Sequence, residues 1–161
     1  MQMKEWEKLN PDQFWNEDSI SSEIWKRAAI TIHSHWLSEE EAEQHWMSVS
    51  SINPDNSDQW DEFLLKEKAF IDLFIKLEND NGFHLWKMNE NEILNHEAQP
   101  DMETLCKRNV REEQFDLFKS DSLEIVIAGN YDLTFPVYQP RNVSWSSLSK
   151  IIGSVGLYLL T

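Results

Sequence analysis

The sequence predicts an α+β fold in which N-terminal helices pack on a C-terminal antiparallel β-meander, with a short helix before the last strand. Apolar residues of the first half recur at helical spacing, whereas those after Phe115 form short runs separated by the turn compositions SDS and GNYD. The two patterns are segregated along the chain rather than alternating, which is typical of α+β proteins. We expect one domain over residues 1–161, a length that supports a single hydrophobic core.

The first predicted helix lies in the stretch SSEIWKRAAITIHSHW. Ser21 or Ser22 is placed to cap its start. The apolar side chains of the stretch fall at i, i+3, i+4, i+7 and i+11: Trp25, Ala28, Ala29, Ile32 and Trp36. This spacing places them on one face of a helix of about four turns.

Two more helices are predicted before Gly82. Ser38 stands three residues before Glu41, which is the spacing of a capping box, and Trp46 is expected to point inward from the helix that follows. The next helix begins at Ser57 or Asp58 and ends at the turn-forming NDNG. Its apolar face is built from Trp60, Phe63, Leu64, Phe70, Leu73, Phe74 and Leu77.

The second half of the sequence predicts short strands and two short helices. A strand is expected over residues 83–88 and a helix over 101–112, with Asp101 as its cap. Three further strands are expected in FDLFK, LEIVIA and LTFPVY. A brief helix in SSLSKIIGSV then precedes a last strand in GLYLLT.

Composition and charge exclude several classes of protein. The formal net charge of −15 repels phosphate backbones and anionic lipids, so we expect neither nucleic acid nor a membrane as a partner. No apolar run approaches the roughly 20 residues that span a bilayer, and no signal peptide is expected at the N-terminus. The single cysteine, Cys106, fits a reducing compartment. We therefore expect a cytoplasmic protein.

The negative charge is concentrated early in the chain. Residues 36–65 contain eight acids and no Lys or Arg, together with three Trp and one Phe. Capping explains part of this excess, because acidic side chains favour the first turn of a helix. The acids expected to line an outer rim are Glu40, Glu43, Asp55, Asp58, Asp61 and Glu62. Two interpretations fit them equally: a solvated face, or a surface that meets Lys and Arg side chains of a basic protein partner.

No pattern predicts a metal site or a cofactor. His33 and His35 stand two apart within the predicted helix, where their side chains diverge. Glu41 and His45 share a helix face, but neither the paired histidines of a zincin nor the repeated Glu-x-x-His units of a di-iron bundle are present.

No catalytic residue is predicted either, and we do not expect an enzyme. Cys106 precedes Lys107 and Arg108, whose charges favour a thiolate, but a buried structural cysteine is the more common case. The four glycines form no phosphate-binding loop.

The C-terminal third carries a resemblance to a family. The acidic meander SLEIVIAGNYDLTFPVY, the helix WSSLSKIIGSV and the final GLYLLT resemble the end of immunity proteins from bacterial polymorphic and contact-dependent growth inhibition toxin systems. The resemblance implies a protein that binds one cognate toxin domain and covers its active site or an exosite. The negative charge of this chain favours a basic toxin domain, and we expect one of nuclease type.

Two other functions fit the sequence. One is a small-ligand protein or enzyme with a pocket between helices and sheet, whose titrating members would include His33, His35, His84 and Cys106. The other is an adaptor that binds a different basic surface, which has the same electrostatics as the inhibitor.

Overall fold

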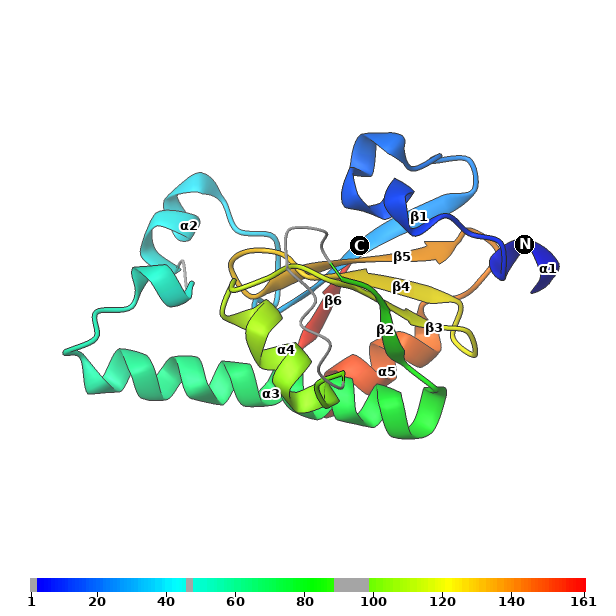
Figure 1. Ribbon diagram of the computed structural model, residues 1–161. Helices are drawn as coiled ribbons and strands as arrows, with labels where there is room; N and C mark the ends of the chain where they lie inside the picture. Colours follow the sequence, from blue (N-terminus) through cyan, green and yellow to red (C-terminus); the bar gives the residue numbers. More distant parts are fainter. Residues whose placement is uncertain (1–2, 46–47, 89–98) are drawn as a thin grey trace.

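The computed structural model describes residues 3–45, 48–88 and 99–161, and it has an α+β fold. Six strands form one antiparallel sheet in the order β2-β3-β4-β5-β1-β6 (Figure 1). Their bounds are β1 Trp25–Thr31, β2 His84–Lys87, β3 Leu117–Ser120, β4 Ile125–Ala128, β5 Thr134–Pro140 and β6 Tyr158–Leu160. The meander predicted after Phe115 is therefore β3 to β5, with β2 paired to β3 at its outer edge, and β6 pairs with β1.

Three helices, Ser57–Asn81, Met102–Val110 and Ser146–Ser154, cover one face of this sheet (Figure 1). The α-helices are α1 Met3–Trp6, α2 Glu39–His45, α3 Ser57–Asn81, α4 Met102–Val110 and α5 Ser146–Ser154. Short 3₁₀ turns occupy Pro11–Trp15, Glu17–Ser19 and Val49–Ser51. Within the described ranges, no helix combines the length and the apolar character needed to cross a membrane.

The helix predicted between Ser21 and Trp36 is wrong, because this stretch forms strand β1. β1 lies inside the sheet, where it pairs with β5 along its whole length and with β6 at its end. Both of its faces are covered, so Ala28 and Ala29 are both buried although they point to opposite sides. Burial on both faces removes the alternation that identifies a strand and leaves apolar spacings that imitate a helix.

The other predicted elements are confirmed wherever the chain is described. Ser38 and Glu41 form the capping box of α2, with the Glu41 amide donating to Ser38 Oγ at 3.2 Å. Asp101 caps α4 by accepting from the Thr104 amide at 2.8 Å. The cap of α3 is Asn56, one residue before the predicted Ser57 or Asp58. Trp46 lies outside the described residues.

The main core lies between the sheet and α3, α4 and α5. Phe118 on β3 and Phe135 on β5 point to this face and pack edge-on against Phe74 of α3, with ring centroids 4.9 and 6.2 Å away. Phe74 is fully buried, as are Ile30 and Leu77. Aromatic side chains bury large areas, so this cluster contributes most to holding α3 against the sheet.

The opposite face of the sheet is covered by residues 6–20 rather than by a regular helix layer (Figure 1). Phe14 packs against Trp25 of β1 and Tyr138 of β5, with ring centroids 5.1 and 5.5 Å away. Trp6 and Phe14 are both 2% exposed. These contacts fill the second face and explain why β1 is buried on both sides.

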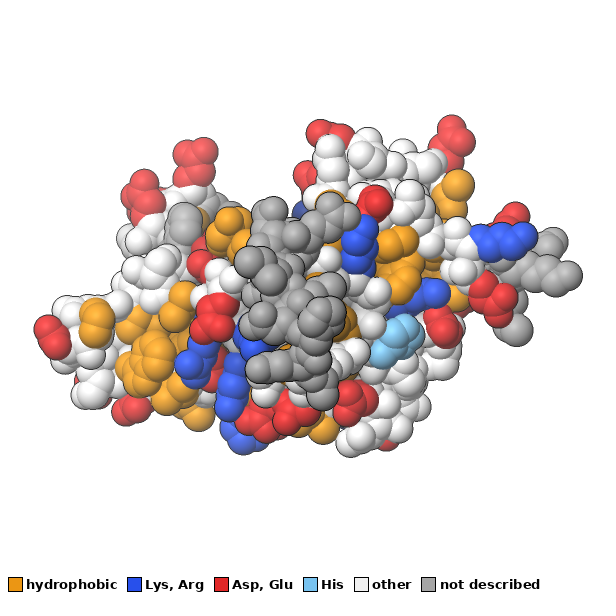
Figure 2. Space-filling model, in the orientation of Figure 1, with side chains coloured by type: hydrophobic (Ala, Val, Ile, Leu, Met, Phe, Trp, Pro, Cys, Tyr) orange, Lys and Arg blue, Asp and Glu red, His pale blue; other side chains and the backbone are white. Residues whose placement is uncertain are grey.

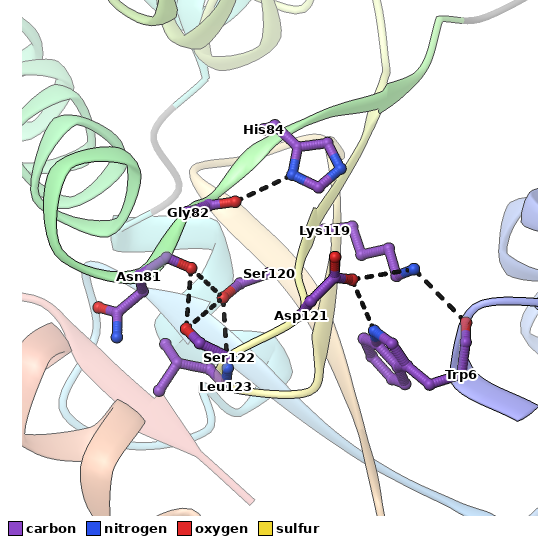
Figure 3. A network of polar contacts seen from close by, with 9 residues as sticks. All are labelled: Trp6, Asn81, Gly82, His84, Lys119, Ser120, Asp121, Ser122 and Leu123. Carbon is purple, nitrogen blue, oxygen red and sulfur yellow. Dashed lines mark hydrogen bonds and ion pairs between the residues drawn. The ribbon is translucent and has the colours of Figure 1, made fainter. Parts of the chain in front are cut away.

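A polar network fastens this N-terminal layer to the β3–β4 turn (Figure 3). The Trp6 indole donates to Asp121 Oδ1 at 2.7 Å, and Lys119 Nζ lies 3.0 Å from the same oxygen. Lys119 also lies between the rings of Trp6 and Trp86, 5.0 and 5.3 Å from their centroids. Burial raises the pKa of Asp121, but the hydrogen bonds from Trp6 and Lys119 outweigh it, so the net pKa is lowered.

Candidate functional site

The acidic segment of the sequence projects from one end of the molecule. We call residues 39–45 and 48–62 the acidic arm; it contains α2, the 3₁₀ turn at Val49–Ser51 and the first turns of α3 (Figure 1). The start of α3 extends past the end of the sheet. In Figure 1, α2 stands above these first turns of α3.

All six acids expected to bind a partner are exposed on this arm. Glu40 and Glu43 are three residues apart on α2 and so point to the same side. On α3 the spacing is the same, because Asp58, Asp61 and Glu62 fall at i, i+3 and i+4. Asp55 lies in the loop between the two helices. Figure 2 shows acidic side chains at both the upper and the lower border of the arm.

None of these six carboxylates forms an ion pair with any residue that the structure describes. The neighbouring Glu41 differs, because its Oε2 lies 2.8 Å from His35 Nε2. Elsewhere the acids are commonly paired, as at Lys68–Asp72 and Lys107–Glu103. The arm thus concentrates negative charge without internal neutralisation.

The base of the arm is anchored to the end of α4 by a half-buried ion pair. Glu67 of α3 is 3% exposed, and both its oxygens accept from Arg111, at 2.6 Å from Nε and 2.9 Å from Nη2. The Arg111 guanidinium lies 5.7 Å from the Trp60 ring, which stacks on Phe63. Hydrogen bonding to Glu67 raises the pKa of Arg111. Trp60, which the sequence predicts on the apolar face of this helix, therefore packs at the base of the arm.

Apolar side chains lie next to the acids on α3. Leu65 is 69% exposed and Leu64 is 36% exposed, although the sequence predicts Leu64 on the buried face. They stand two and three residues after Glu62, and Figure 2 shows hydrophobic surface gathered over the N-terminal part of α3. Apolar groups bordered by charge are a common composition of protein-binding surfaces.

A cavity of about 400 Å³ lies between α2 and the end of the sheet; we call it the Trp36 cavity. Its walls include Trp36 and Tyr131, which are 59% and 57% exposed, and the hydroxyls of Thr31 and Thr134, which are 2.9 Å apart. Ala42 of α2 also lines it, so the cavity adjoins the acidic arm. A volume of this size suits a small organic ligand or an inserted side chain.

The structure brings together only part of the predicted pocket residues. His33 and His35 both line the Trp36 cavity. His84 lies on the edge strand β2, with Nδ1 2.9 Å from the Gly82 carbonyl oxygen (Figure 3). Cys106 is fully buried in the main core, and burial raises the pKa of its thiol well above the ordinary value. Its placement contradicts a role for Cys106 in the same pocket as the histidines.

Sequence reasoning missed several residues that line cavities. Tyr131 and Asp132 enter the Trp36 cavity from the β4–β5 turn, and Lys26 and Arg141 share a second cavity. Recognising β1 as a strand beside β5 is the signal that would have placed Lys26 near Arg141, because these residues belong to antiparallel neighbours.

Among the described residues, no group of three or more His, Cys, Asp or Glu side chains is arranged to hold a metal ion. Comparisons of this chain with protein-family models, with curated proteins and with solved structures found no match.

Proposed function

We propose that the protein is an inhibitor of the immunity type, which binds and neutralises a basic toxin domain through its acidic arm. The observation that supports this most is the set of six exposed carboxylates that have no ion-pair partner in the described chain. Mutual repulsion of these charges destabilises the free arm, and Lys and Arg side chains of a partner relieve it.

The arm and the residues next to it combine charged groups, which speed association with a partner, and apolar groups, which hold the partner once it is bound. Charges on its border steer a basic partner at long range, which raises the association rate. Leu64, Leu65 and Trp36 supply apolar surface beside those charges, and such side chains are the groups that slow dissociation once desolvated. The proposed site of action is the cytoplasm, where a nuclease-type toxin would meet its substrate.

A charge-reversal experiment tests the arm. Glu40, Glu43, Asp61 and Glu62 are replaced together by Lys, and the matched control replaces four exposed acids outside the arm by Lys: Glu7, Glu23, Glu78 and Glu113. Both variants have the same net charge. The partner is the product of the gene immediately upstream, first isolated by pull-down with the tagged protein at low and high salt.

We expect the arm variant to associate at least about tenfold more slowly than the control variant at low salt, with the gap closing as salt is added. Association rates are measured by stopped-flow fluorescence, alongside toxin activity in the complex. Equal slowing of both variants would show that only net charge matters. Association of the arm variant at the wild-type rate, or failure to retain any toxin-like partner, contradicts the proposal.

A second candidate is a small-ligand protein that uses the Trp36 cavity. The observation that favours it is the cavity itself, which combines two aromatic walls with His33, His35 and the Thr31–Thr134 hydroxyl pair. A thermal-shift screen of small molecules on the wild type and on Trp36→Ala tests it. A ligand that stabilises the wild type but not Trp36→Ala supports this candidate, and stabilisation of both proteins to the same extent contradicts it.

A further inference from the structure

A second cavity, of about 550 Å³, lies where β1 begins and β5 ends; we call it the Lys26–Arg141 cavity. β6 pairs only with Ala29–Thr31, so the first residues of β1 have no neighbour on that side within the sheet. Trp25, Lys26 and Arg27 of this free edge line the cavity. Its lining includes Lys26, Arg27, Arg141, Glu17, Asp18 and Trp145.

The charge of this cavity is opposite to that of the protein as a whole. Three bases and two acids line it, in a chain that has 14 bases and 29 acids. Arg27 pairs with Glu17. Neither Lys26 nor Arg141 forms an ion pair with a described residue. Half of the 14 bases, all of which lie in the described ranges, do form one: Arg27, Lys68, Lys76, Lys87, Lys107, Arg111 and Lys119.

The sheet forces these two unpaired cations together. The Arg141 amide donates to the Ile24 carbonyl oxygen at 2.9 Å, which continues the pairing of Trp25 with Pro140 and holds Arg141 beside the start of β1. Burial and then the charge of Arg141 lower the pKa of Lys26, and no carboxylate offsets either effect. Folding therefore places the half-buried Lys26 and the exposed Arg141 close together, and an anion between them would relieve the repulsion.

Both cations are already oriented by neutral groups. Lys26 Nζ donates to the Val143 carbonyl oxygen and stands 4.6 Å from the centroid of the Trp145 ring, and Arg141 Nε donates to the Ser22 carbonyl oxygen. These contacts fix the position of each cation and leave other N–H groups of the ammonium and guanidinium for a ligand. Trp145 and Ile20 add an apolar wall.

We propose that the Lys26–Arg141 cavity binds a small organic anion, with its carboxylate or phosphate group between Lys26 and Arg141 and its apolar body against Trp145. This site is separate from the acidic arm and does not depend on the inhibitor function. Arg141 offers parallel N–H donors that match a carboxylate or phosphate, and Lys26 adds a point charge. The cavity volume suits a ligand with one aromatic ring.

The test uses the full chain at about 20 mM salt with two probes, phenyl phosphate and benzoate, and with uncharged benzyl alcohol as the control ligand. Calorimetry measures the affinities. We expect at least one anion to bind with a Kd below about 10 mM and benzyl alcohol not to bind. The anion that binds more tightly identifies the group that the site prefers. Absence of binding by both anions, or equal binding of benzyl alcohol, overturns the proposal.

Variants then locate the binding. Lys26→Met and Arg141→Met are expected to weaken binding about tenfold each, whereas Lys150→Met, which removes an exposed charge from α5, should change it less than about twofold. Equal affinity in all three variants overturns the proposal. If Lys26→Met or Arg141→Met does not fold, the indole N–H resonance of Trp145 is followed in the wild type. As the anion is added, the chemical shift of this resonance must saturate with the Kd that calorimetry gives. A resonance that does not move overturns the proposal.

Discussion

Gly129 lies next to a buried hydrogen-bond network between Asn109 of α4 and Asp116, the residue before β3. Asn109 of α4 is fully buried and donates from Nδ2 to the Leu105 carbonyl oxygen and to Asp116 Oδ2, while its Oδ1 accepts from the Asp116 amide at 2.8 Å. A Cβ at position 129 would stand 2.0 Å from Asn109 Oδ1. The glycine is needed at this position because a side chain there would displace the buried amide.

Gly129→Ala should lower the free energy of unfolding by about 3 kcal/mol, since it combines overpacking with loss of buried hydrogen bonds. Gly153→Ala is the control, because nothing lies within 4 Å of its added Cβ and the site is helical. The control should be neutral or stabilising by up to about 1 kcal/mol. Urea unfolding measures both, and equal effects would contradict the role of the Asn109 contact.

Asp132 is predicted to make stability depend on pH. Burial raises the pKa of this carboxyl, and the charge of Glu112 raises it further. The folded state therefore holds the proton more tightly than the unfolded chain, so the free energy of unfolding falls as pH rises from the ordinary Asp value, about 3.9, through the raised folded pKa.

Asp132→Asn removes this titration, and Asn also tolerates the positive φ of 62° at this position. We expect the variant to be more stable than the wild type at pH 7, with a difference that shrinks below about pH 4. Urea unfolding at several pH values measures the difference. A difference that does not change with pH would show that the carboxyl charge is not its cause.

At the scale of elements, α3 consists of a short first segment, residues 57–62, and a longer segment from Phe63 onward that packs on the sheet. Residues from Phe63 to Leu77 supply its buried face, whereas the turns before Phe63 extend past the sheet as part of the acidic arm. Local interactions must therefore define where the helix starts. Asn56 is the N-cap and accepts from the Gln59 amide at 3.1 Å, and Gly82 ends the helix in the left-handed conformation, with φ of 61°.

Asn56→Ala should cost about 1 kcal/mol and fray the first turns of α3, because no side chain then accepts from the amides at the helix start. Asn56→Asp should preserve the cap. Hydrogen exchange is the readout, since amides around residues 61–65 should exchange faster in Asn56→Ala while those around 70–77 remain protected. Equal loss of protection along the whole helix would indicate global rather than local unfolding.

At the scale of the whole molecule, charge and packing are separated in space. The core is apolar and aromatic on both faces of the sheet, while much of the excess negative charge lies on the arm. The net charge of −15 destabilises the compact state through self-repulsion, and dissolved salt screens this repulsion between exposed groups.

Adding NaCl from about 20 to 300 mM should raise the free energy of unfolding of the free protein. Salt should raise the free energy of unfolding less in the arm variant with four Lys than in the control variant with four Lys outside the arm. Their net charges are equal, but only the arm variant removes the repulsion among the arm carboxylates. Thermal unfolding at each salt concentration measures the gains. Equal gains would show that the arm charges do not repel one another more than those elsewhere.

Local signals in the sequence determined much of this fold. The capping residues Ser38 and Asp101, the stop at Gly82 and the short runs between turn compositions after Phe115 each act within a few residues, so their consequences were predictable. The exposure of the arm acids was predictable for the same reason, since charged side chains at helix starts remain in water.

Only the tertiary structure decided where β1 lies and which cavities exist. Residues 25–31 contain apolar spacings that fit a helix. Their strand conformation depends on pairing with β5 and β6, which lie more than 100 residues away in the sequence, beyond the reach of any local signal. The same pairing brings Lys26 to Arg141, and chain reversal after β4 brings Tyr131 to Trp36. Long-range pairing and burial on two faces outweigh local propensity, because the free energy of packing exceeds the small differences between helix and strand preferences.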